Sequence, residues 1–167
     1  LRDLAAEDDD PVPRMLGQIE RSLERFRIHF DSFERQSEIE AEIARLAGVF
    51  VRLGISEIRL TGGEPTVHPN LVEIVGNIAQ IPGIQEIALT TNGVLLAEQV
   101  QELYDAGLHR VTVSLDTLKP DRFRRLTGRD EYARVLEGIE SVGSVGFADL
   151  KLDTVAIRGF NDDELVA

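Results

Sequence analysis

The sequence predicts an α/β fold in which parallel β-strands alternate with helices. From about residue 55 onward, short runs rich in β-branched residues are each followed by a glycine-rich or polar turn and then by apolar residues at helical spacing. The distance between successive runs leaves room for a helical crossover, which joins parallel neighbours. The predicted strands are residues 57–61, 86–90, 110–115 and 150–157.

Amphipathic helices are predicted between these strands, because apolar residues recur three, four and seven positions apart. A further helix precedes the first strand, and Gly54 is placed to end it as a C-cap residue. The apolar positions of the four helices are Ile39, Ile43, Leu46, Phe50 and Leu53; Leu71, Ile74, Val75 and Ile78; Leu96, Val100 and Leu103; and Tyr132, Val135, Leu136 and Ile139.

Residues 1–37 do not share this rhythm and are predicted to form a divergent acidic and helical segment. Residues 8–10 are a run of like charges followed by Pro11, a helix breaker, and residues 15–26 fit a charged amphipathic helix. We therefore predict two parts, residues 1–37 and residues 38–167. The second part holds all the predicted strands.

Composition limits the classes of function. A chain of 167 residues that is 43% hydrophobic and 29% charged has the composition of an ordinary globular protein of about one domain. No apolar run is long enough to cross a membrane, and the acidic amino terminus differs from a basic signal peptide, so we expect a cytoplasmic protein without membrane contact. The net charge of -12 disfavours nucleic acid as a partner.

Residues that bind metal ions are scarce. The chain has no cysteine, which excludes disulfides, thiolate nucleophiles and zinc or iron-sulfur centres held by its own thiolates. His29, His68 and His109 lie in unrelated segments. The sequence therefore predicts no metal site.

Three glycine-rich or polar segments follow the first three predicted strands: residues 61–65, 90–93 and 114–116. Ligands of parallel α/β folds gather at the carboxyl ends of the strands, where the strand-to-helix loops converge. The three segments therefore predict one shared binding site at that edge of the sheet.

Individual residues of these segments suit a ligand, although each also fits an ordinary turn. Gly62 and Gly63 allow a close approach of the backbone to a ligand, and Glu64 supplies a carboxylate suited to an ammonium group or to structural hydrogen bonds. Ser114 carries a hydroxyl for a ribose or a carboxylate. The structural alternative is that Glu64 and Asp116 serve the amino ends of helices.

Two cations, Arg59 and Lys151, lie inside predicted strands. If they face a barrel interior, they need an anionic partner, since an unpaired buried charge is costly. If the strand register turns them outward, they are solvated or paired surface residues.

The order of motifs along residues 38–167 closely resembles radical S-adenosylmethionine enzymes, and within them the GTP 3',8-cyclase family of molybdenum-cofactor biosynthesis. Shorter segments at 126–128, 135–139, 151–153 and 159–162 extend the match. The motifs that carry the resemblance are Ile-Arg-Leu-Thr-Gly-Gly-Glu-Pro at 58–65, Leu-Thr-Thr-Asn-Gly at 89–93, Asp-Ala-Gly-Leu at 105–108 and Val-Ser-Leu-Asp at 113–116.

The resemblance implies a partial, incomplete (βα) barrel of the TIM type that binds S-adenosylmethionine and GTP. By position in the motifs, S-adenosylmethionine would contact the glycine-rich loop and a strand end, and GTP would contact cations and a hydroxyl on the strands. In the family, a reduced four-iron four-sulfur cluster cleaves S-adenosylmethionine to a 5'-deoxyadenosyl radical, which acts on GTP. The implied residues are Gly62, Gly63, Glu64 and Ser114 for S-adenosylmethionine, and Arg59, Thr90 and Lys151 for GTP.

The sequence departs from the family at the cluster. The family holds its cluster with C-x3-C-x2-C upstream of the Gly-Gly-Glu-Pro motif, and the corresponding positions here fall near Val12, Leu16 and Ile19, which cannot bind iron. We therefore expect that this chain cannot perform the radical chemistry by itself, and we assign it no catalytic residue.

Residues 1–35 faintly resemble a segment of arginyl-tRNA synthetases, through residues 14–16 and 26–33. If that match reflects origin, the chain joins two unrelated pieces. Three interpretations follow: part of a GTP 3',8-cyclase, a non-catalytic nucleotide-binding or interaction module, or a joined chain without a function of its own.

Overall fold

The computed structural model describes residues 36–164. The predicted acidic segment and its helix at 15–26 lie outside these residues, as do the positions near Val12, Leu16 and Ile19. The elements, in chain order, are α2 (Gln36–Arg52), β1 (Glu57–Leu60), the short 3-10 turn η1 (Pro65–Val67), α3 (Leu71–Ala79), β2 (Glu86–Thr91), α4 (Leu96–Asp105), β3 (Arg110–Ser114), α5 (Pro120–Thr127), α6 (Tyr132–Val145), β4 (Leu150–Asp153) and the 3-10 turn η2 (Asp162–Glu164).

The four strands form one parallel sheet in the order β1-β2-β3-β4. Each strand is joined to the next through at least one helix, as parallel pairing requires. This arrangement confirms the predicted α/β fold with parallel strands.

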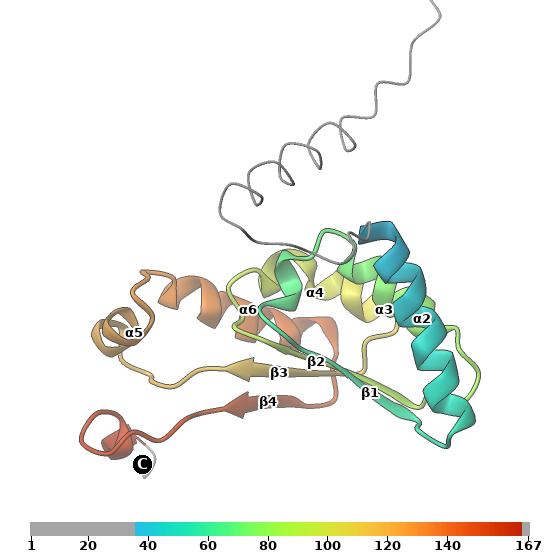
Figure 1. The fold of residues 1–167 in the computed structure, drawn as a ribbon. Helices are drawn as coiled ribbons and strands as arrows, with labels where there is room; N and C mark the ends of the chain where they lie inside the picture. The colour runs from blue at the N-terminus through green and yellow to red at the C-terminus, as the bar shows by residue number, and fades with distance from the viewer. Residues whose placement is uncertain (1–35, 165–167) are drawn as a thin grey trace, which may run out of the picture. The chain divides into compact units, whose positions relative to one another are not determined.

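The helices cover one face of this sheet, and the other face is open among the described residues (Figure 1). Alternate residues of a strand point to opposite faces, so each strand contributes apolar side chains to one face and polar ones to the other. The covered face holds the core: Ile87, Leu89, Val111 and Val113 from the strands, Val75 and Ile78 from α3, Leu96 and Leu103 from α4, and Val135 and Val142 from α6, all fully or almost fully buried.

Helix α6 lies unusually close to the loop that follows β2. A Cβ atom added at Gly138 of α6 would lie 2.5 Å from the carbonyl oxygen of Gly93 and 3.1 Å from Cβ of Leu96. Gly93 itself adopts a φ of 80°, in the left-handed region that favours glycine. The two glycines therefore allow α6 to hold this loop in place.

The fourth predicted strand is too long. Residues 150–157 were expected to be extended, but β4 ends at Asp153. Beyond it, the Thr154 hydroxyl donates to the carbonyl of Leu115, the Val155 amide donates to the Asp116 carboxylate, and the Ile157 amide donates to the Asn161 side chain. The β-branched residues after Asp153 are thus bound into a loop by one backbone and two side-chain acceptors that no local pattern reveals.

Helix α5 was not predicted, because it is short and charged. It has a proline at its start, Pro120, and ends at Gly128, whose φ of 71° is typical of a C-cap glycine. Among the described residues, no helix is long and apolar enough to cross a membrane.

Candidate functional site

A cavity of 310 Å³ lies where β1, β2 and β3 end. It collects residues from all three of the polar segments that the sequence singles out, and five of its lining residues are predicted site residues. The lining residues are Thr61, Gly62, Gly63, Glu64, Thr90, Thr91, Asn92 and Ser114.

The carboxylate of Glu64 organises this cavity. Its Oε1 atom accepts hydrogen bonds from the Thr66 amide at 3.0 Å, the Thr66 hydroxyl at 2.7 Å and the Thr91 hydroxyl at 2.6 Å. Its Oε2 atom accepts one from the Asn92 amide at 2.7 Å. Glu64 therefore ties the loop after β1 to the loop after β2, and only Oε2 keeps room for a further donor.

The loop after β2 is further shaped by its own side chains. The Gly93 amide donates to the Thr91 hydroxyl at 3.1 Å, and the Val94 amide donates to the Asn92 side chain at 2.9 Å. Asn92 thus forms an Asx turn, consistent with the ordinary turn that this segment also fits. Thr90, by contrast, points to the open face of the sheet.

The open face carries the two strand cations. Nη1 of Arg59 donates to the hydroxyls of Thr90 at 3.2 Å and Thr112 at 3.3 Å. Lys151 pairs with Thr112 in the sheet register, so its side chain emerges on the same face, and its ammonium lies 2.7 Å from the Asp153 carboxylate. Lys151 does not line the 310 Å³ cavity, and its side chain is 57% exposed.

A second cavity of 350 Å³ adjoins the first and shares Glu64, Asn92 and Ser114 with it. It extends toward helices α5 and α6. Its other lining residues are Val67, Val94, Phe123, Thr127, Arg129 and Glu131, of which only Thr127 lies in a segment that the sequence analysis names.

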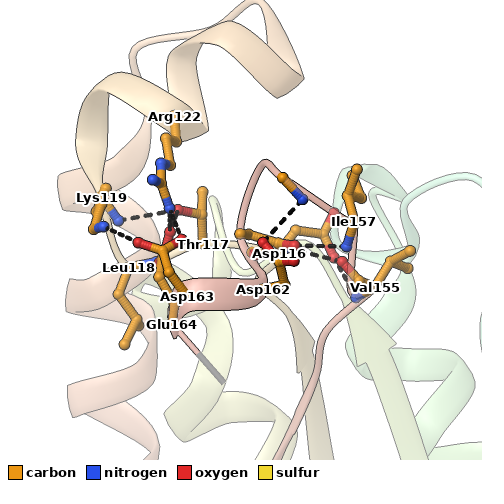
Figure 2. Close-up of polar contacts among 12 residues, drawn as sticks. Asp116, Thr117, Leu118, Lys119, Arg122, Val155, Ile157, Asp162, Asp163 and Glu164 are labelled. Carbon is orange, nitrogen blue, oxygen red and sulfur yellow. Dashed lines mark hydrogen bonds and ion pairs between the residues drawn. The ribbon is translucent and has the colours of Figure 1, made fainter. Parts of the chain in front are cut away.

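Asp116 does not cap helix α5. Its Oδ1 atom accepts from the Val155 amide at 2.8 Å, and the N-cap position of α5 is Lys119, which makes no side-chain cap (Figure 2). The neighbouring Asn161 is fully buried and donates to the carbonyls of Asp116 and Val155. Asp116 and Asn161 therefore join the loops after β3 and β4 at the same edge of the sheet as the cavity.

Beside them, residues of the turn η2 bond to residues at the start of α5 (Figure 2). We call this cluster the clamp; it comprises Thr117, Lys119, Arg122, Asp163 and Glu164. Asp163 accepts from Lys119 and Arg122. Glu164 accepts from the Thr117 hydroxyl and from Arg122. Sequence reasoning missed the clamp, because its acids and bases are more than 40 residues apart.

The clamp lowers the pKa values of its two acids. Hydrogen bonds from Arg122 and then Lys119 hold the pKa of Asp163 well below its usual range. Burial acts to raise the pKa of Glu164, but hydrogen bonds from the Leu118 amide, Arg122 and Thr117 outweigh it and lower the pKa.

We expect the clamp to lose stability in acid. Because the folded pKa of Asp163 is lower than the unfolded value of about 4, its contribution is fully present above about pH 4 and is lost as the pH falls further. The free energy of unfolding should therefore fall less steeply below pH 4 in Asp163→Asn than in the parent chain, as measured by urea unfolding. Asp130→Asn, at an exposed position, should keep the parent profile. Parallel profiles for the parent and Asp163→Asn would contradict this account.

A metal centre is not evident at this edge. Among residues 36–164, no three histidine, aspartate or glutamate side chains are grouped so that they could hold a metal ion. The whole chain contains no cysteine.

Comparisons with known sequences identify GTP 3',8-cyclases among the relatives of this chain. The chain is 49% identical over 128 residues to GTP 3',8-cyclase 3 of Mycobacterium bovis, which covers 74% of this chain and 34% of the relative. It is 51% identical over 125 residues to GTP 3',8-cyclase of Moorella thermoacetica, which covers 75% of this chain and 39% of the relative. With GTP 3',8-cyclase 1 of Mycobacterium tuberculosis it shares 44% identity over 142 residues, or 82% of this chain and 40% of the relative. The chain thus spans 34% to 40% of the length of these curated relatives.

Solved structures agree on the fold. HydG, a maturase of FeFe hydrogenase, superposes with a TM-score of 0.60 at 14% identity over 77% of this chain and 30% of its own. HemN of Escherichia coli, a coproporphyrinogen III oxidase described as a radical SAM enzyme, superposes with a TM-score of 0.51 at 14% identity over 72% of this chain and 31% of its own.

The family model of the radical SAM superfamily matches residues 22–167, and so begins ahead of the predicted boundary at residue 38. The matched region includes every described strand and the three segments that converge on the 310 Å³ cavity. The predicted resemblance to radical SAM enzymes of the GTP 3',8-cyclase kind is confirmed by these matches. The chain belongs to the radical SAM superfamily.

Proposed function

We propose that residues 38–167 form a ligand-binding region that holds S-adenosylmethionine at the carboxyl ends of β1 to β3 and GTP on the open face of the sheet. The observation that carries the proposal is the 310 Å³ cavity, which brings together Gly62, Gly63 and Glu64 from the loop after β1, Thr90 from β2 and Ser114 from the end of β3. The similarity to GTP 3',8-cyclases over three quarters of the chain supports the choice of ligands.

The residues of this cavity fit S-adenosylmethionine. Gly62 and Gly63 are exposed, and a Cβ atom added to either would meet nothing within 4 Å, so the backbone there is open to a ligand. Oε2 of Glu64 has acceptor capacity for the ligand's ammonium group, and the exposed Ser114 hydroxyl can bond its ribose or carboxylate. Together these groups would bind and orient the ligand.

An iron-sulfur cluster does not fit this chain. Its iron atoms require thiolates, and the chain has no cysteine. Among the described residues, no group of histidine, aspartate or glutamate side chains replaces them. We therefore derive no step through a cluster, and the proposed function is binding alone.

Binding of S-adenosylmethionine should depend on the absence of a side chain at Gly63. In Gly63→Val, the new Cβ would meet no other atom within 4 Å, so the fold should persist while the side chain occupies space at the cavity and excludes the ligand. We expect at least a tenfold loss of affinity by isothermal titration calorimetry with S-adenosylmethionine. Gly143→Val, in an exposed part of α6 where the added Cβ also meets nothing, should bind like the parent. Equal affinity for Gly63→Val and the parent would refute this assignment.

For GTP, the supporting observation is the pair of cations on the open face. Arg59 bonds two neutral hydroxyls, from Thr90 and Thr112, and so its charge is not neutralised by them. Lys151 pairs with Asp153 at an exposed position, where an ion pair is weak and a triphosphate can compete for the ammonium. A nucleotide bound there would lie within the polar face of the sheet.

GTP binding should weaken about tenfold in Lys151→Ala, because the variant loses one charged hydrogen bond to a phosphate. A tenfold loss of affinity corresponds to roughly 1.4 kcal/mol, which is of the order expected for such a bond. The affinity should also fall as salt is raised, since phosphate contacts at an exposed face are screened. Arg45→Ala removes the same charge from α2, where Arg45 bonds Glu42 among the described residues, and should leave the affinity unchanged. Titrations that do not distinguish Lys151→Ala from Arg45→Ala would count against the site.

A further inference from the structure

The strand cation Arg59 is held by neutral groups on the open face of the sheet. Its Nη1 atom donates to the Thr90 hydroxyl at 3.2 Å and to the Thr112 hydroxyl at 3.3 Å. The first acceptor lies on β2 and the second on β3, so the side chain crosses two strand spacings, about 10 Å in total. Thr112 is the far end of this crossing, and it is not among the proposed ligand contacts.

The sheet register places Thr112 between the two cations of the open face. Thr112 is paired with Thr90 on one side and with Lys151 on the other. Arg59 is paired with Ala88, two residues before Thr90, so its side chain leans toward the carboxyl ends of the strands as it crosses. The guanidinium group therefore reaches the strand next to Lys151, although β1 and β4 are three strand spacings apart.

An acid that could neutralise Arg59 lies on the same face. Glu57 is two residues before Arg59 in β1, and residues two apart in a strand point to the same side. Among residues 36–164, however, Arg59 takes part in no ion pair. Since hydroxyls do not neutralise a guanidinium group, the bonds to Thr90 and Thr112 orient Arg59 and leave its charge available to an anion.

Thr112 itself is poorly placed to touch a ligand. It is fully buried, whereas Arg59 and Lys151 are exposed. A buried hydroxyl affects a ligand through the side chains that contact it, and the side chain that donates to Thr112 is Arg59. Thr112 is therefore suited to orient the guanidinium group rather than to bind the nucleotide.

We propose that Thr112 is a positioning residue of the GTP site, whose hydroxyl holds the guanidinium group of Arg59 near Lys151 so that both cations face one phosphate chain. The inference rests on the proposed function, since it concerns the GTP site on the open face. Without the Thr112 hydroxyl, Arg59 keeps its more exposed bond to Thr90 and is free to turn toward Glu57, which would neutralise its charge. The affinity for GTP should then fall.

Isothermal titration calorimetry with GTP tests this role. Thr112→Val keeps the shape of the side chain but removes the hydroxyl, and we expect the dissociation constant to rise about fivefold, which corresponds to about 1 kcal/mol. Thr112→Ser keeps the hydroxyl and should bind GTP within about twofold of the parent. Equal affinities of Thr112→Val and the parent would overturn the proposal, as would a loss in Thr112→Ser as large as that in Thr112→Val.

Thr117→Val is the matched control for the loss of a buried hydroxyl. Thr117 is 3% exposed, and its hydroxyl also bonds a charged side chain, that of Glu164, but it does so in the clamp rather than on the strands. The variant loses a buried hydrogen bond as Thr112→Val does, yet it should bind GTP like the parent. Equal losses of affinity in Thr117→Val and Thr112→Val would reflect general destabilisation and would overturn the proposal.

A double-mutant cycle shows whether Thr112 acts through Arg59. In an Arg59→Gln chain, which has lost the guanidinium group, adding Thr112→Val should change the dissociation constant for GTP by less than about twofold. A loss of the same size in both backgrounds would mean that Thr112 acts independently of Arg59, and would overturn the proposal.

The same titrations separate this inference from the proposed function. A parent chain that does not bind GTP would overturn both. GTP binding that is weakened by Lys151→Ala but not by Thr112→Val would leave the GTP site in place and overturn the role of Thr112 alone.

Discussion

Replacing Glu64 with alanine should lower the free energy of unfolding by about 3 kcal/mol. The carboxylate accepts four hydrogen bonds from the loops after β1 and β2, and two of its partners, Thr66 and Thr91, are 2% exposed. Without Glu64, the buried Thr66 and Thr91 groups lose their acceptor, and each buried unsatisfied group costs about 1 to 3 kcal/mol. Urea unfolding followed by circular dichroism measures the loss.

Two variants sharpen this experiment. Glu64→Gln keeps an oxygen for Thr66 and Thr91 but sets an NH2 group against the Asn92 amide, so we expect an intermediate loss. Glu98→Ala, which removes a 64% exposed carboxylate paired with Arg134, should cost far less. If Glu64→Ala and Glu98→Ala have the same midpoint, Glu64 does not organise the site.

The second large effect is expected at Gly138, where alanine should destabilise the protein by about 2 kcal/mol. The added Cβ would lie 2.5 Å from the Gly93 carbonyl oxygen, so either α6 or the loop after β2 must move. Overpacking of this kind costs about 1 to 3 kcal/mol, which exceeds the gain of up to about 1 kcal/mol from placing alanine in a helix. The displaced loop carries Asn92, and so binding of S-adenosylmethionine should weaken as well.

Gly76→Ala is the matched control for Gly138→Ala. Gly76 lies in the interior of α3, and an added Cβ there meets nothing within 4 Å. Because no steric clash arises, the remaining effect is the higher helix propensity of alanine over glycine. This variant should therefore stabilise the protein by about 0.5 to 1 kcal/mol. Opposite signs for the two substitutions are expected in urea unfolding, and a stabilising Gly138→Ala would contradict the close approach.

Much of the fold could be predicted because each strand and long helix repeats a local pattern. Apolar residues three and four positions apart mark α3, α4 and α6, and β-branched runs mark the strands. Helix α5 escaped prediction because its eight residues bury only Phe123 and carry no apolar stripe. β4 was predicted too long because the residues after Asp153 have strand-like composition but form hydrogen bonds to backbone and side-chain acceptors in loops.

The sequence predicted which residues lie at the site but not what each of them does there. Position at the carboxyl ends of parallel strands placed Gly62, Gly63 and Ser114 in one cavity. The two uses considered for Glu64, a ligand contact or structural hydrogen bonds, could not be separated by sequence. The structure shows four structural bonds at this side chain. Its contact with S-adenosylmethionine stays a prediction.

Residue type and local spacing were enough to predict the order of the strands and of the long helices, the glycine-rich and polar loops between them, and the lack of any thiolate for a cluster. Which polar groups are already satisfied follows from the folded arrangement alone. Glu64 bonds Thr91 across 27 residues, and Asn161 bonds Asp116 across 45 residues. Such partners meet only when the loops of the folded sheet converge, so no local pattern in the chain can specify them.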